Sequence, residues 1–525
     1  MPPTYDTSFA PYVVPGGLPV GREDLPDLRW FGLMALGQLR GALRAALTRW
    51  SDQAPGWLAS GVVARAFAAR VERWAPQAAG RVASEGDVEL AYLRFAGTNP
   101  FTIRRARQVS DVPERLRLPD DVFASLVGEG PSLAERVLAG DVFVSSYDAR
   151  RVSAADDLQP GKYVAPVSAL FVHAPELSAR FPVVPVAIAC ASGTPDGGTE
   201  VVLPTDGWRW RAAKRMLQVA DVHASELEVH LGRTHFMTVP FAIAMRRRLS
   251  AAHPIRQFLM PHLRYNLFVD RMAWLQGVRA SSGVLVRSLA GSARWSQAVA
   301  KTLWYEASFR EQHFERDLAA RGLSEVPFDL PFRDDGRLLW DAIRRFTGAY
   351  VALTYADDAA LQADPALHAF LAEVASPGAG NVRGLLEGER LETREELVEI
   401  LTQVLFVAGP VHALCHYGSA AQLQDVQDSP SWLIANPLAT GVDATPSRVG
   451  GLTQLTRVVS TNVRHDKLGD FARYPLGGRP ECRPLVAAFQ ADLRRVEDEI
   501  GRRNLDRPAP YLHLLPSRLT NGITV

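Results

Sequence analysis

Cysteine is scarce in this chain: only Cys190, Cys415 and Cys482 occur among its 525 residues. Three thiols so far apart in sequence cannot form a disulfide framework or a cysteine-rich zinc site, and such scarcity is typical of a reducing compartment. The N-terminal stretch MPPTYDTSFAPYVVPGG also lacks the basic and apolar segments of a secretory signal. We therefore expect a cytoplasmic protein.

The chain also lacks an excess of charge of either sign, because 58 Lys and Arg residues are balanced by 57 Asp and Glu residues. This balance gives no indication of a nucleic-acid partner. No uninterrupted apolar run reaches the roughly 18 residues that a membrane span requires. We expect no transmembrane segment, and transient contact with a membrane surface stays open.

What the chain does have is apolar content for a large core, with 47% hydrophobic residues. No repeat or low-complexity linker divides it, so we expect one domain over residues 1–525, with residues 1–30 as an extended arm rich in Pro and Gly. Short Val-rich runs predict a small antiparallel sheet within about 140–205. Helical spacing dominates residues 206–525, so the predicted fold class is mainly α with one small sheet.

Two pairs of histidines stand in the helical part. On an ideal α-helix His230 and His235 would point roughly 140° apart, so they could share a metal ion only across a π-type turn, a feature typical of functional sites. His412 and His416 lie on one face of an undistorted helix. Because an unpartnered imidazole is costly to bury, the four are candidate metal ligands. For either pair alone, an ordinary core or surface role stays open.

The same segments resemble a known family. HLGRTH at residues 230–235, the following HPIRQFLMPHLRY, and the helix that contains HALCHYG are similar to the catalytic domain of lipoxygenases. AGTNPFTI, nearer the N-terminus, resembles the GxNP stretch of that domain. The resemblance covers nearly the whole length and leaves no room for the N-terminal β-barrel of animal and plant members. It implies a bacterial-like catalytic domain alone, with a lipoxygenase-like helical fold.

The last segment, PYLHLLPSRLTNGITV, resembles the lipoxygenase C-terminus, whose final residue gives its main-chain carboxylate to the metal. The resemblance therefore implies one non-heme iron per chain, because neutral imidazoles and a carboxylate without thiolate suit a redox-capable ion better than structural zinc. Manganese stays open, since family members that end in valine include manganese forms. The implied ligands are His230, His235, His412, His416 and Val525.

The activity that the resemblance implies is insertion of O2 into the cis,cis-1,4-pentadiene of a polyunsaturated fatty acid, which gives a hydroperoxide. A metal-bound hydroxide would act as the base, and no side chain is assigned a catalytic role beyond it. The expected partners are the fatty acid and O2, and the expected oligomeric state is a monomer.

Five further residues fall on family positions that contact or influence the substrate. Ala273 stands where alanine accompanies S-configured products, and Gly277 and Val278 stand where a leucine commonly clamps the diene. Glu226 and Ser419 replace two glutamines that link ligands to substrate by hydrogen bonds. These departures keep two alternatives open: a divergent enzyme acting on fatty-acid hydroperoxides or another unsaturated substrate, and a non-catalytic lipid-binding protein.

Three other histidines lie near the first pair in sequence. His223, His253 and His262 lack the spacing of the metal set. We expect His253 and His262 to lie at helix ends or on the surface.

Overall fold

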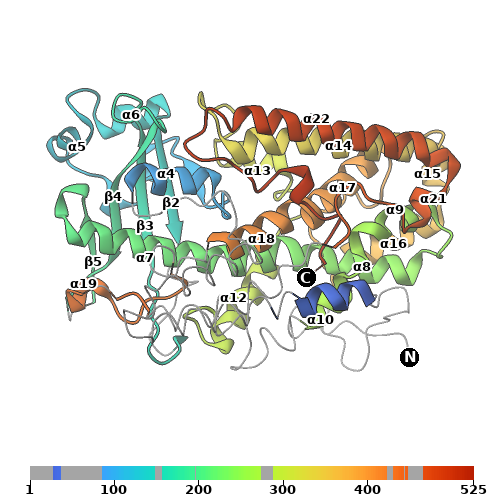
Figure 1. Ribbon diagram of the computed structural model, residues 1–525, viewed down its shortest axis with the longest axis horizontal. Coiled ribbons are helices and arrows are strands. Elements are labelled where there is room, and N and C mark those ends of the chain that lie inside the picture. Colours follow the sequence, from blue (N-terminus) through green and yellow to red (C-terminus); the bar gives the residue numbers. More distant parts are fainter. Residues whose placement is uncertain are drawn as a thin grey trace, which may run out of the picture.

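The computed structural model describes residues 28–36, 39, 86–147, 157–194, 197–272, 288–422, 430–442, 444–446 and 465–524. Within these residues the protein is mainly helical and contains one five-stranded sheet (Figure 1). The predicted fold class is confirmed. Most of the predicted arm lies outside the described residues, and residues 28–30 already belong to a helix over 28–36.

All five strands of the sheet pair antiparallel with their neighbours in sequence. The three middle strands are the Val-rich runs that the sequence predicts. The two edge strands escape prediction because three or four residues show no clear alternation. The strands are β1 (Ile103–Arg105), β2 (Val142–Tyr147), β3 (Val167–His173), β4 (Val183–Ala191) and β5 (Thr199–Val202).

The two faces of the sheet pack against different helices, because successive side chains in a strand point to opposite sides. Val144 of β2 belongs to a small apolar cluster with α5 (Asp120–Val127) and α6 (Leu133–Ala139). Its neighbour Phe143 belongs to the main core, together with α7 (Trp208–Ala224). The sheet therefore anchors the start of the longest helical path among the described residues.

That path runs from α7 through a π-helix, η7 (Ser225–His235), into α8 (Phe236–Arg248). Both junctions keep right-handed helical backbone angles, and α7 and α8 lie end to end in Figure 1. The chain then turns back through α9 (Pro254–Leu263) and α10 (Asn266–Met272).

A second helical path lies beside the first. It consists of α17 (Arg394–Phe406), a π-helical turn η9 (Val407–Val411), and α18 (His412–Gln422). Its stretch Arg394–Gly418 is long and apolar enough to cross a membrane, yet 94% of its most apolar window is buried in the protein. Polar residues such as Thr402, Gln403 and His412 interrupt this stretch, and its burial is that of a core helix.

Further helices surround these two paths, and α14 and α22 lie side by side along one edge of the molecule (Figure 1). Breaks at Tyr355 and Asp364 separate α14, α15 and α16. These helices are α12 (Ala293–Glu306), α13 (Phe314–Ala320), α14 (Pro331–Thr354), α15 (Asp358–Gln362), α16 (Pro365–Ala375), α19 (Pro437–Thr440), α21 (Pro475–Gly478) and α22 (Arg483–Arg503).

A buried polar network fixes α7 one turn before the π-helix begins. Arg94 of α4 (Asp87–Ala96) and Asp221 of α7 form an ion pair of 2.9 Å, with side chains 1% and 4% exposed. Tyr147 and Asn99 each donate a hydrogen bond to the same carboxylate, at 2.6 and 2.9 Å. Removing one partner of such a pair costs about 3–5 kcal/mol, so the network holds this end of the path firmly.

Candidate metal centre

Four imidazoles from the two helical paths converge in the interior. The Nε2 atom of His230 lies 3.2 Å from Nε2 of His235 and 3.4 Å from Nε2 of His412. The ring of His416 lies 5.2 Å from that of His230 and stacks on His412 at 5.4 Å. Ligand atoms of His230, His412 and His416 all lie within 4.8 Å of one another, close enough to hold one metal ion.

The π-helix explains how the first pair meets. An i to i+5 hydrogen-bond pattern brings residues five apart onto one face, which an α-helix would not do. The predicted π-type turn is confirmed, and it extends over eleven residues. The second pair, by contrast, spans one ordinary turn at the start of α18. The π-helical turn η9, just before His412, was not predicted, and it contains Pro410, which cannot donate to a helical hydrogen bond.

An ion-pair network connects η7 to α13. Arg233, between the two histidines, lies 3.0 Å from the carboxylate of Asp317 on α13, and Arg321 pairs with the same carboxylate at 2.5 Å. Burial raises the pKa of Asp317, but the two guanidinium groups outweigh it and lower the pKa below its ordinary value. Asp317 therefore stays charged and ties η7 to α13.

Carboxylates orient two of the imidazoles. Oε2 of Glu226 lies 3.0 Å from Nδ1 of His230, and Oδ1 of Asp270 lies 2.6 Å from Nδ1 of His235. Asn266 donates a hydrogen bond to the other oxygen of Asp270. Each carboxylate holds a proton on Nδ1, so each ring presents the lone pair of Nε2 to the centre. Two lone pairs facing each other at 3.2 Å repel unless a cation lies between them.

This donor set fits a transition-metal ion. Neighbouring nitrogens bound to one ion at about 2.1 Å stand roughly 3 Å apart, which matches the observed spacings. Cys415, in the same turn of α18, contributes no thiolate, because burial raises the pKa of its thiol well above the ordinary value. Imidazoles supported by carboxylates suit a first-row ion that can change oxidation state better than a cysteine-rich zinc site.

The C-terminal segment is buried as far as the structure describes it. Leu519, Thr520, Asn521, Ile523 and Thr524 are each no more than 2% exposed. The expected carboxylate ligand, Val525, lies outside the described residues. The segment nevertheless enters the interior, as docking of its end on the histidine cluster would require.

Hydrogen bonds and two close backbone approaches hold this segment. The backbone N–H of Asn521 donates to the carbonyl of Asp466, and Nδ1–H of His262 donates to the carbonyl of Asn521, both at 2.7 Å. A Cβ atom at Gly522 would stand 1.9 Å from the carbonyl oxygen of His262, so no other residue fits. Gly409 of η9 allows a similar approach, since its Cβ would lie 2.8 Å from the carbonyl oxygen of Thr520.

The structure gives the other three histidines structural roles. His223 accepts a hydrogen bond from the Ala290 N–H and donates to the Val219 carbonyl, both at 2.8 Å, so neither nitrogen is available for a metal. His253 caps α9, as expected for a helix end. His262 lies at the end of α9 as expected but not on the surface, because it is buried against the C-terminal segment.

The substrate positions are less completely described. Ala273, Gly277 and Val278 lie outside the described residues. Ser419 belongs to α18, although its side chain is also outside the description. Only Glu226 is placed in full, and its carboxylate contacts His230.

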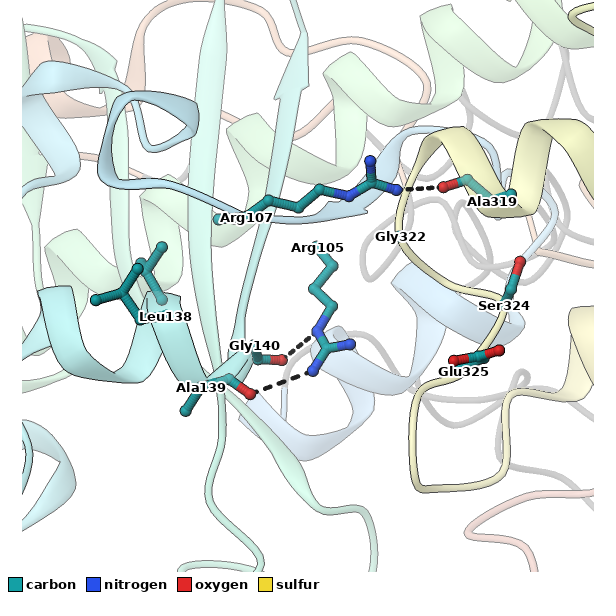
Figure 2. A pocket seen from close by; sticks show the side chains of 11 residues that line it. Arg105, Arg107, Leu138, Ala139, Gly140, Ala319, Gly322, Ser324 and Glu325 are labelled. Atoms are coloured by element: carbon teal, nitrogen blue, oxygen red, sulfur yellow. Dashed lines mark hydrogen bonds between the residues drawn. The ribbon is translucent and has the colours of Figure 1, made fainter.

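A surface pocket of about 470 Å³ lies elsewhere, between α6 and α13. Figure 2 shows Arg105 donating to the carbonyls of Ala139 and Gly140, while Arg107 donates to that of Ala319. The arginines thus satisfy carbonyls at the ends of two helices. None of the four histidines lines this pocket, so it is not part of the metal centre.

Sequence reasoning missed Asp270, whose carboxylate is as close to the centre as that of Glu226. Its position follows from the return of the chain through α9 and α10, which brings Asp270 back beside η7. A polar residue inside the apolar run LFVDRMA was the available signal, because a carboxylate in such a run needs a buried partner.

Comparison with known proteins agrees with this site. The sequence profile described as Lipoxygenase matches residues 188–424. The linoleate 9/13-lipoxygenase of Pseudomonas aeruginosa is 31% identical over 467 residues, covering 82% of this chain and 66% of that protein. The chain therefore spans just under two thirds of the length of that relative.

Two solved structures share the fold. A lipoxygenase variant crystallised with arachidonate superposes with a TM-score of 0.80 at 21% identity, covering 96% of this chain and 76% of the other. The manganese lipoxygenase of Gaeumannomyces graminis gives a TM-score of 0.78 at 20% identity, covering 95% and 91%.

Fold and site together define a mainly helical domain organised around a centre in which His230, His412 and His416 cluster and His235 lies beside His230. With the matching profile and relatives, the chain belongs to the lipoxygenase family. Members of this family bind a catalytic metal, which is iron in most and manganese in some.

Proposed function

We propose that this protein is a dioxygenase that joins O2 to a polyunsaturated fatty acid and releases a hydroperoxide. The observation that carries the proposal is the convergence of four imidazoles from two distant helices beside a buried C-terminal segment. The net reaction breaks one bis-allylic C–H bond, forms one C–O bond and one O–H bond, and converts the double bond of O2 into the O–O single bond of the hydroperoxide. Both oxygen atoms of O2 stay in the product, so no further reductant is consumed.

The proposed metal is a single iron ion, with manganese as the alternative. His230, His235, His412 and His416 would bind it through imidazole nitrogens, and Val525 through its main-chain carboxylate. When bound, such a metal supplies the one-electron oxidation that a bis-allylic carbon requires. The absence of a thiolate and the presence of two supporting carboxylates favour a redox-active ion over zinc.

The protein's own residues would prepare the site for this chemistry. Glu226 and Asp270 hold the Nδ1 protons of their histidines and keep the rings fixed while the charge of the centre changes. Buried apolar residues of α17 and η9, including Phe406 and Val411, exclude water near His412. A dry surrounding protects a carbon radical from side reactions.

The proposed substrate class follows from the fatty acids that appear in the names of similar proteins. The Pseudomonas aeruginosa relative is a linoleate lipoxygenase, and one structural neighbour holds arachidonate. Both are polyunsaturated fatty acids, so we propose this class together with O2. We also propose a monomer in the cytoplasm, and the three buried free thiols support a reducing location.

The test is to incubate the purified protein with linoleate and with arachidonate while recording oxygen uptake and conjugated-diene absorbance, alongside metal analysis. Equal molar oxygen uptake and diene formation, lost in His412→Ala, are the expected result. His368→Ala, a half-buried histidine on α16, is the matched control and should keep the activity. Iron or manganese bound without oxygen uptake would contradict the proposed reaction.

One observation favours a second candidate, which is rearrangement of a fatty-acid hydroperoxide. Glu226 places a carboxylate at the family glutamine position and contacts His230 directly. Added negative charge stabilises the oxidised metal, which weakens it as an oxidant of C–H bonds. The variant Glu226→Gln separates the two candidates. Faster oxygen uptake by this variant than by the parent protein supports the dioxygenase. The rearrangement is supported if the variant stops consuming fatty-acid hydroperoxide and takes up no oxygen.

A further inference from the structure

The two ends of the described chain meet in space. Trp30 lies in the N-terminal helix over residues 28–36, and its indole N–H donates a hydrogen bond of 2.7 Å to the carbonyl of Thr524. The residues are 494 positions apart, and both are buried. In Figure 1 the short blue N-terminal helix lies beside α10, close to the C-terminus.

The indole is held in place by apolar packing. Trp30 meets the ring of Phe268 on α10 edge to face, with centroids 5.6 Å apart. Phe268 in turn packs on a small cluster that contains Tyr265, Val269 and Ile523. The N-terminal helix thus covers the same apolar surface on which the C-terminal segment rests.

Thr524 also contacts a second helix, α18. The hydroxyl of Tyr417 lies 3.3 Å from Oγ1 of Thr524, and Tyr417 directly follows His416 in α18. Thr524, the residue before the proposed carboxylate ligand, is therefore held at two points. Its carbonyl accepts a hydrogen bond from Trp30 of the N-terminal helix, and its hydroxyl contacts that of Tyr417 on α18.

We propose that Trp30 is a positioning residue for the metal centre, and that the N-terminal helix clamps the C-terminal segment so that its carboxylate stays on the metal. The proposal rests on the proposed function in one respect, the role of Val525 as a ligand. A free chain end samples many conformations, and ordering its residues when the carboxylate binds costs conformational entropy. That cost weakens the bond between the carboxylate and the metal. Fixing Thr524 beforehand removes that cost.

The test compares Trp30→Phe with Trp208→Phe, which changes a half-exposed tryptophan on α7. Phenylalanine keeps an aromatic ring against Phe268 and removes the N–H donor together with part of the apolar bulk of the indole. Loss of one buried hydrogen bond, with the Thr524 carbonyl left unsatisfied, favours opening of the segment roughly five- to tenfold. Deuterium uptake by the peptide over residues 519–524, and the rate at which a chelator removes the metal, should both rise by that factor in Trp30→Phe alone.

A second variant, Thr524→Val, leaves the N-terminal helix intact and removes the partner of Tyr417. It should raise both rates about threefold or more, and the helical peptide over residues 331–354 should not change in either variant. Rates within a factor of two of those of Trp208→Phe, for either readout, would overturn the proposal.

Oxygen uptake by the unmodified protein is measured separately. If it is absent while Trp30→Phe still loosens the segment and speeds metal loss, the clamp stands and the proposed reaction fails.

Discussion

Asp270 lies 35 residues beyond His235 in the chain, yet its carboxylate stands 2.6 Å from the Nδ1 atom of that ring. Because a carboxylate on Nδ1 makes the imidazole a stronger ligand, Asp270→Asn should weaken metal binding by roughly 10- to 100-fold. A competition titration with a chelator measures this affinity. Asp341→Asn, at an exposed position of α14, is the control, and equal affinities in the two variants would show that Asp270 has no part in the centre.

His223 makes a pH-dependent contribution to stability. Burial lowers its pKa from 6.5 to about 4, because an imidazolium would lose its hydration there, and this loss outweighs the opposing hydrogen bond to the Val219 carbonyl. Protonation would also cost Nε2 the hydrogen bond that it accepts from the Ala290 N–H. The unfolded chain takes up the proton first, so this stability is complete above pH 6.5 and is lost as the pH falls toward 4. At pH 5 the loss is about 2 kcal/mol.

The variant His223→Gln tests this pH dependence. It should be less stable than the parent protein at pH 8, with a difference that shrinks by about 2 kcal/mol at pH 5. Urea unfolding at the two pH values measures both differences. His368→Gln should leave the pH dependence unchanged, and a constant difference between parent and His223→Gln would contradict the assignment.

Residue spacing makes the two histidine pairs candidate metal ligands, and the resemblance to lipoxygenases joins them into one proposed ligand set. The same reasoning cannot find Asp270 or Trp30, whose contacts depend on how separate helices pack. Nor does spacing place His262: its position near a helix end is predicted, but its burial follows from the arrival of the C-terminal segment from 259 residues away.

At the scale of elements, the centre depends on close approaches between η9, α9 and the C-terminal segment. Gly522→Ala would place a methyl group 1.9 Å from a backbone carbonyl, which cannot move as a side chain can. The segment must therefore shift, and we expect metal content to fall about tenfold with little change in the fold. Gly501→Ala is the control, since it adds a methyl group in open space on α22.

Metal analysis and circular dichroism of the two glycine variants separate loss of docking from loss of folding. The Gly501→Ala protein should be as metal-rich as the parent and slightly more stable, because alanine favours a helix by up to about 1 kcal/mol. A Gly522→Ala protein with full metal content would show that the C-terminal segment is not required at the centre.

Elements differ in how well the sequence predicts them. The Val-rich strands β2, β3 and β4 and the π-helix η7 follow from patterns within a few residues. The strands β1 and β5 are too short to show a pattern. They form because their backbones can hydrogen-bond to the longer strands β2 and β4. The buried pair of Arg94 and Asp221, which fixes α7 ahead of η7, joins segments that share no local signal.

At the scale of the whole molecule, the chain end is proposed to act as a ligand, which makes the centre sensitive to chain length. Appending one alanine after Val525 moves the carboxylate away and should abolish both oxygen uptake and stable metal binding. Val525→Ile keeps the carboxylate at the same distance and should retain both. Unchanged turnover and metal content in the extended protein would remove Val525 from the ligand set.

The central claim is that the four imidazoles and the terminal carboxylate bind one redox-active ion. X-ray absorption spectroscopy of the purified protein at the iron and manganese edges tests it most directly. The account predicts one such ion per chain, surrounded by nitrogen and oxygen atoms at about 2.1–2.2 Å with no sulfur neighbour. A zinc edge at one ion per chain, a sulfur neighbour near 2.3 Å, or no bound metal would contradict it.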